Sequence, residues 1–123
     1  MKQHSPQFLK LVNKAKESIN EITSQMLKKK IEQQESFFLI DVREESEWAG
    51  GHIATAIHLG KGIIERDIEK TITDPESQIV IYCSGGFRSA LVANSLGKMG
   101  YTQVYSLQTG SQGWLDAGYG LIK

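Results

Sequence analysis

Cysteine and proline are scarce in this chain of 123 residues, which contains one cysteine, Cys83, and two prolines. A single cysteine cannot form an internal disulfide bond, and it cannot build a thiolate-based zinc site alone. Cys83 is therefore either a small buried apolar residue or a chemically active thiol. With 12 glycines and 40% hydrophobic residues, the composition is that of an ordinary folded domain and argues against a disordered or fibrous chain.

The chain also lacks net charge, because 14 basic residues balance 14 acidic ones. Such a balance provides no bulk attraction to nucleic acid or to an anionic membrane. No segment approaches the roughly 18 consecutive apolar residues of a membrane span. Residues 1–16 lack the apolar core of a secretory signal. We therefore predict a cytoplasmic protein with no nucleic-acid or membrane partner.

Two uninterrupted apolar runs, residues 37–40 and 79–82, stop at Asp41 and Cys83. Runs without alternation are typical of strands that are buried on both faces of a parallel sheet. Short strands are predicted at residues 19–22 and 104–105, and helices at residues 23–31, 63–68 and 90–96 and around Trp114. Strands that alternate with helices predict an α/β layer fold.

The first residues have apolar side chains at helical spacing, including Phe8, Val12 and Ala15. Ser5 and Pro6 suit the N-cap and the first turn of a helix. We predict that residues 1–20 form a helical extension of a single domain at residues 21–123. Packing of this helix on the domain is favoured over packing on a partner chain.

The segment most informative about function joins the second apolar run to a helical pattern and reads Cys83-Ser84-Gly85-Gly86-Phe87-Arg88-Ser89. Ligands bind at the carboxyl ends of strands in open parallel sheets. The two glycines permit a tight curl in which backbone N–H groups converge on one anionic centre. The start of the following helix and the Arg88 cation favour a thiolate over a thiol. We predict that Cys83 is a nucleophile cradled by these donors, and we favour this over a purely structural cysteine.

No second catalytic group is evident from the sequence. A cysteine–histidine protease arrangement would require His4, His52 or His58 beside Cys83, and the sequence alone cannot place any of them there. We interpret His52 as making structural hydrogen bonds, and we expect Asp41 and Arg43 to pair locally and to brace adjacent loops. Phosphate-loop, dinucleotide-binding and zinc-ligand spacings are all missing, so we predict neither a cofactor nor a metal.

From about Ile22 to its C-terminus, the chain resembles the rhodanese homology domain in its single-domain sulfurtransferase form. No single element is specific, and the resemblance depends on the order and spacing of many. These are Leu39-Ile40-Asp41-Val42-Arg43-Glu44, Glu47-Trp48, Gly51-His52-Ile53, Ala56-Ile57, Val80-Ile81-Tyr82-Cys83, Gly86, Arg88-Ser89, Leu96, Gly100-Tyr101, Val104, Gly110, Trp114 and Gly118.

The resemblance implies a five-stranded, mainly parallel sheet with helices on both faces. It also implies that Cys83 takes a sulfane sulfur from thiosulfate or a persulfide, holds it as a persulfide, and passes it to cyanide or a thiol. The ring of backbone N–H groups from Ser84 to Ser89 would surround the outer sulfur. The implied partners are a small-molecule donor and acceptor, with a protein persulfide as a further partner.

Some thiosulfate-using relatives carry cations directly after the cysteine, where this chain has the neutral residues Ser84 and Gly85. This departure predicts that thiosulfate is a poorer donor than a persulfide. Two further departures, Ala54 in place of a frequent proline and Thr109 in place of the first glycine of a frequent Gly-Gly pair, concern loop shape.

Two other functional classes remain open at this point. The first is a cysteine phosphatase or arsenate reductase. Related cysteine phosphatases place five residues between cysteine and arginine, whereas four separate Cys83 from Arg88, which predicts a smaller cavity. A non-catalytic docking module is the second alternative. Arg88 has two interpretations, contact with the substrate or bracing of the loop through a carboxylate such as Asp41 or Glu44. Phe87 lies either at the pocket rim or in the core, while Trp114 and Tyr82 are expected in the core.

Overall fold

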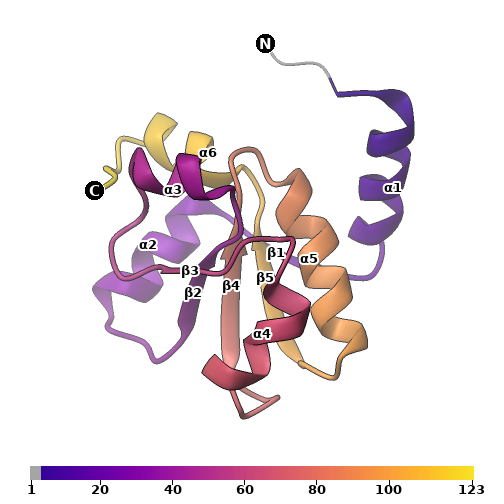
Figure 1. Ribbon diagram of the computed structural model, residues 1–123. Helices are drawn as coiled ribbons and strands as arrows, with labels where there is room; N and C mark the ends of the chain where they lie inside the picture. Colours follow the sequence, from indigo (N-terminus) through magenta and orange to yellow (C-terminus); the bar gives the residue numbers. More distant parts are fainter. Residues whose placement is uncertain (1–3) are drawn as a thin grey trace.

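The computed structural model describes residues 4–123, and a parallel sheet runs through its centre (Figure 1). Its five strands are β1 (Asn20–Ile22), β2 (Phe38–Asp41), β3 (Ile57–His58), β4 (Gln78–Tyr82) and β5 (Gln103–Leu107). They lie in the order β1-β5-β4-β2-β3, and every neighbouring pair is parallel. The predicted α/β fold is confirmed, and the sheet is parallel throughout.

Helices cover both faces of this sheet. The helices of the described residues are α1 (Pro6–Lys16), α2 (Ser24–Glu32), α3 (Glu45–Ala49), α4 (Ile64–Thr71), α5 (Phe87–Lys98) and α6 (Gly110–Asp116). Of these, α4 and α5 cover one face, and α2 and α6 cover the other. In β4, Ile79 and Ile81 pack in the core beneath α4 and α5, while Val80 and Tyr82 pack in the core beneath α2 and α6. All four side chains are fully buried. Burial on both faces explains why this segment is apolar without alternation.

The N-terminal helix α1 packs on α5, at the edge of the molecule (Figure 1). Val12 and Ala15 form its buried face, as their helical spacing predicts. Residues 1–3 of the predicted extension lie outside the described residues, and the division at residue 20 stays a prediction. None of the helices within residues 4–123 combines the length and the apolar character needed to cross a membrane.

A buried ion pair lies at the carboxyl end of β2. The Arg43 guanidinium donates to Asp41 Oδ2 at 2.8 Å and to the Gly51 carbonyl at 2.7 Å. Burial opposes the charge of Arg43, but the hydrogen bond and the charge of Asp41 outweigh this effect, so the pKa of Arg43 is raised. Beside the pair, the Ile53 N–H donates to the Tyr82 hydroxyl at 3.0 Å. These contacts fix the loops that follow β2 relative to β4.

Candidate active site

Cys83 directly follows β4, and its sulfur faces the first turn of α5. The N–H groups of Gly86 and Ser89 donate to Cys83 Sγ at 3.2 Å and 3.4 Å. The Ser89 hydroxyl oxygen lies 3.6 Å from the same sulfur and 2.7 Å from the hydroxyl oxygen of Ser106. Donors that converge on one atom at a helix N-terminus are suited to holding a negative charge there.

The backbone of the loop is held in shape by one glycine of the Gly85-Gly86 pair. Gly86 has a φ of +92°, in the region that favours glycine, and a Cβ atom there would lie 2.1 Å from the Gln108 carbonyl oxygen. Gly85 has no positive φ, and a Cβ atom on it would meet the Phe87 ring at 3.4 Å. The close approach of two backbones therefore requires glycine at position 86.

The first turn of α6 holds the other side of the loop. The Ser111 N–H donates to the Cys83 carbonyl at 2.8 Å, and the Gln112 N–H donates to the Ser84 carbonyl at 3.0 Å. Gly110 has a φ of +64°, and a Cβ atom on it would lie 2.4 Å from the Ser84 carbonyl oxygen. Thr109 has an ordinary φ of −108°, so the preceding position does not require glycine.

Arg88 braces the loop through a carboxylate on α3. Its Nη1 and Nη2 atoms donate to Glu47 at 2.8 Å and 3.1 Å, and Nη2 also donates to Ser84 Oγ at 3.2 Å. The Ser84 hydroxyl donates to Glu47 at 3.0 Å. The hydrogen bond from Arg88 is the main reason why the pKa of Glu47 falls to about 2.

The carboxylates that the sequence suggested for Arg88, Asp41 and Glu44, are not its partners. Asp41 is engaged by Arg43. Glu44 precedes α3, and the side chain that reaches Arg88 belongs to Glu47, within the helix. The expected bracing through a carboxylate is present, but its partner is Glu47. The two named carboxylates were wrong because α3 was not predicted, and its helical geometry directs Glu47 toward the loop.

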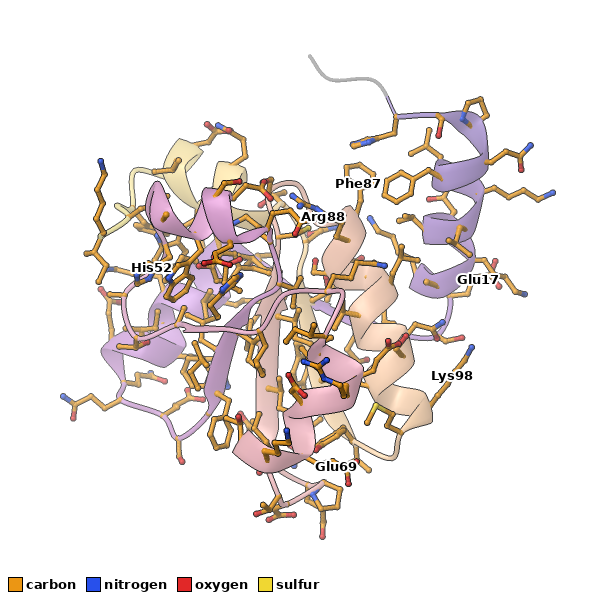
Figure 2. The ribbon with its side chains drawn as sticks, in the orientation of Figure 1. Glu17, His52, Glu69, Phe87, Arg88 and Lys98 are labelled. Carbon is orange, nitrogen blue, oxygen red and sulfur yellow. The ribbon has the colours of Figure 1, made fainter. Side chains whose placement is uncertain are left out.

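A cavity of about 760 Å³ opens beside the loop. Cys83 is 1% exposed and lines this cavity, which places it at the cavity floor. Ser84, Gly85, Phe87 and Arg88 line it from the loop and the start of α5, and Gln112 lines it from α6. The remaining lining residues, His4 and Phe8, come from the N-terminal segment. Phe87 points from α5 toward α1 (Figure 2).

Comparison with known proteins identifies the family. Residues 23–117 match the model of the rhodanese-like domain. The chain belongs to the rhodanese-like domain family.

Rhodanese-like relatives and neighbours agree with this result. The candidate sulfurtransferase YtwF of Bacillus subtilis is 38% identical over 96 residues, which cover 78% of this chain and 90% of YtwF. The thiosulfate sulfurtransferase GlpE of Coxiella burnetii is 36% identical over 76 residues, 62% of this chain and 69% of GlpE. A solved structure from Rhodopseudomonas palustris, of unknown function and described as a possible tyrosine phosphatase, covers 99% of both chains at 24% identity and a TM-score of 0.87. At that identity, this last likeness shows the fold alone.

In this rhodanese-like domain, His52 lies away from the cysteine loop (Figure 2). Its backbone exchanges hydrogen bonds with Ile122 at 2.7 Å and 2.8 Å, and its Nδ1 lies 3.0 Å from the Ile53 carbonyl oxygen. Its ring stacks on the Trp48 ring with 3.6 Å between the ring centroids, and the centroids of the His58 and Trp48 rings lie 5.1 Å apart. Trp114 and Tyr82 lie in the core, as their sequence positions suggested.

Sequence reasoning did not place several residues at or near this rhodanese-like site, among them His4, Phe8, Glu47, Gln112 and Ser106. The helical spacing of Phe8 indicates which side of α1 is buried, but it does not indicate that this side borders the cysteine pocket. Ser106 reads as an ordinary strand residue, and only the parallel register of β5 beside β4 brings it near Ser89.

Proposed function

We propose that the protein is a sulfurtransferase that carries a sulfane sulfur as a persulfide on Cys83. The observation that supports this most strongly is the placement of Cys83 Sγ at the floor of a cavity, where it accepts hydrogen bonds from the N–H groups of Gly86 and Ser89. Membership of the rhodanese-like family and the names of the relatives support the same activity. No metal or organic cofactor is needed for this chemistry.

In the first half-reaction, the Cys83 thiolate attacks the outer sulfur of the donor. A new S–S bond forms on Cys83 as the donor's own bond to that sulfur breaks. The leaving group, sulfite from thiosulfate or a thiolate from a persulfide, departs with the electron pair. Electrons balance without an external oxidant or reductant, and the backbone N–H groups stabilise the charge on the persulfide.

In the second half-reaction, the acceptor attacks the outer sulfur of the persulfide. Cyanide becomes thiocyanate and a thiolate becomes a persulfide, while Cys83 leaves as a thiolate. The N–H groups of Gly86 and Ser89 then hold the same charge that they held before loading. The enzyme thus alternates between two anionic states, and the same donors serve both.

The charges around the pocket favour a persulfide donor over thiosulfate. Ser84 and Gly85 are neutral, and both terminal nitrogens of the Arg88 guanidinium are engaged by Glu47. The charge of Arg88 is therefore largely balanced by Glu47, and a thiosulfate dianion would gain little from it. The same pairing disfavours a phosphatase, whose arginine has to bind a phosphate dianion with both nitrogens.

The test is sulfur loading followed by intact-mass measurement, with thiosulfate and glutathione persulfide at equal low concentrations. Wild-type protein should gain one sulfur atom, faster from the persulfide, and Cys83→Ser should gain none. Comparable loading rates from both donors would contradict the donor preference. A protein that gains no sulfur from either donor would be a docking module, and hydrolysis of p-nitrophenyl phosphate that depends on Cys83 would indicate a phosphatase.

A further inference from the structure

The N-terminal helix contributes residues to the same cavity as the nucleophile, although residues 4–22 lie outside the matched family region. His4 precedes α1, and Phe8 lies in its first turns. Val12 and Ala15 are buried one and two turns further along, which anchors the helix. The position of His4 and Phe8 at the cavity is therefore a fixed feature of the packed helix.

Three aromatic rings form one wall of this cavity, and we call them the aromatic wall: His4, Phe8 and Phe87. The ring centroids of His4 and Phe87 lie 4.4 Å apart, those of His4 and Phe8 lie 5.3 Å apart, and those of Phe8 and Phe87 lie 6.4 Å apart. All three pairs are tilted, as favourable aromatic contacts are. Figure 2 shows Phe87 between α5 and α1, facing the latter.

Electrostatic recognition of a strongly charged substrate is weak beside this wall. Among the described lining residues, Arg88 alone carries a permanent charge, and it is paired with Glu47. Lys16 lies 5.5 Å from the centroid of the Phe87 ring, but its ammonium is also 3.6 Å from a carboxylate oxygen of Glu21. The remaining surface near the nucleophile is aromatic or uncharged, so it offers contact area to an apolar group.

We propose that the aromatic wall selects sulfur carriers with an aromatic or bulky alkyl group next to the sulfane sulfur. This inference rests on the proposed function and names the substrate class for the same site. His4 and Phe8 are specificity-determining residues, and α1 is part of the substrate site. A ring on the carrier packs against the wall while its outer sulfur reaches Cys83.

A matched pair of donors isolates the contribution of the ring. Benzenethiosulfonate and methanethiosulfonate carry the same charge and the same reacting group, and they differ in the substituent. With either donor, the Cys83 thiolate attacks the terminal sulfur, the bond from that sulfur to the sulfonyl sulfur breaks, and a sulfinate leaves with the electron pair. The balance requires no proton, oxidant or reductant.

The experiment compares loading efficiencies for both donors in wild type, Phe8→Ala and Leu11→Ala, the control. Leu11 lies on α1 and is 57% exposed, away from the buried face. Because an aromatic contact changes binding by about three- to ten-fold, Phe8→Ala should lower the preference for benzenethiosulfonate by that factor. Leu11→Ala should retain the wild-type preference. If Phe8→Ala does not fold, Phe8→Leu keeps an apolar side chain and removes the ring.

An unchanged donor preference in the Phe8 variant would overturn the inference, and so would an equal loss of efficiency for both donors. If neither thiosulfonate loads wild-type Cys83, a second measurement judges the wall alone, and the proposed function fails only if thiosulfate and glutathione persulfide do not load Cys83 either. In Cys83→Ser, benzenesulfinate should shift the NMR signals of the His4 ring, and Phe8→Ala should weaken this binding about three- to ten-fold. An unperturbed His4 ring would overturn the inference independently of sulfur transfer.

Discussion

The substitution Gly86→Ala tests whether the backbone of the cysteine loop controls the reactivity of Cys83. An added Cβ atom would lie 2.1 Å from the Gln108 carbonyl oxygen and 3.2 Å from the Leu107 carbonyl oxygen. Both are backbone atoms, so neither can rotate away as a flexible side chain would. The φ of +92° adds strain for any residue with a Cβ atom, at a cost of about 1–2 kcal/mol.

The clash can be relieved only by a backbone shift that moves the cysteine loop and the segment at Gln108 apart. Ordinary contact begins near 3.4 Å, so the Cβ atom and the Gln108 oxygen must separate by about 1.3 Å. A displacement of that size breaks the hydrogen bond from the Gly86 N–H to Cys83 Sγ, which is 3.2 Å long. A hydrogen bond to a charged group contributes about 1.5–3 kcal/mol, which corresponds to a rate about 10- to 150-fold lower.

The assay is the rate of sulfur loading on Cys83, measured together with the urea-denaturation midpoint. Gly97→Ala is the control, since it makes the same change in α5 at a position where a Cβ atom meets nothing within 4 Å. It should load at the wild-type rate and be equally or slightly more stable. Folded Gly86→Ala that loads sulfur as fast as Gly97→Ala would refute the reasoning, because the backbone donors would then contribute nothing.

Two further substitutions test the ion pairs around the site. The folded-state pKa of Glu47 is about 2, below its usual 4.5, so the ionised carboxylate stabilises the fold above about pH 4.5 and this contribution is lost as the pH falls through about 2. Glu47→Gln should therefore lower the unfolding free energy near neutral pH by about 0.5–1 kcal/mol and flatten the acid dependence of that free energy in urea titrations. The control Glu45→Gln, at an exposed position, should do neither. A Glu47→Gln variant with the acid dependence of wild type would argue against the pairing. Asp41→Asn leaves Arg43 buried beside a neutral partner, so it should lower the unfolding free energy by about 3–5 kcal/mol in the same urea titration. Asp67→Asn, at the exposed pair with Arg66, is its control, and equal midpoints for the two variants would contradict the account.

The central strands could be predicted from the sequence because helices cover both of their faces, so that nearly every side chain in them is apolar. Residues 37–40 and 79–82 are apolar without alternation, and only a strand covered on both faces needs that pattern. The shorter elements could not be predicted in the same way. β3 has two residues, both half-buried, and α3 has five residues, none of them buried, so neither produces a periodic signal.

The position of Cys83 between a buried strand and a helix N-terminus could be predicted from the sequence, whereas its surroundings could not. Cys83, Gly86 and Arg88 lie within one short segment, and local rules for strand ends and helix starts apply to them. Glu47 and Phe8 reach the same site from distant parts of the chain. Their positions depend on how α3 and α1 pack, and packing geometry is not encoded in local spacing.

The most direct test of the account is to locate the transferred sulfur atom. After incubation with a sulfane donor, tandem mass spectrometry of the digested protein should place one additional sulfur on the peptide that contains Cys83. A thiol acceptor added before digestion should remove this sulfur, and an equal amount of the acceptor's persulfide should form. Sulfur located elsewhere, or sulfur on Cys83 that no acceptor can remove, would contradict a carrier role for this residue.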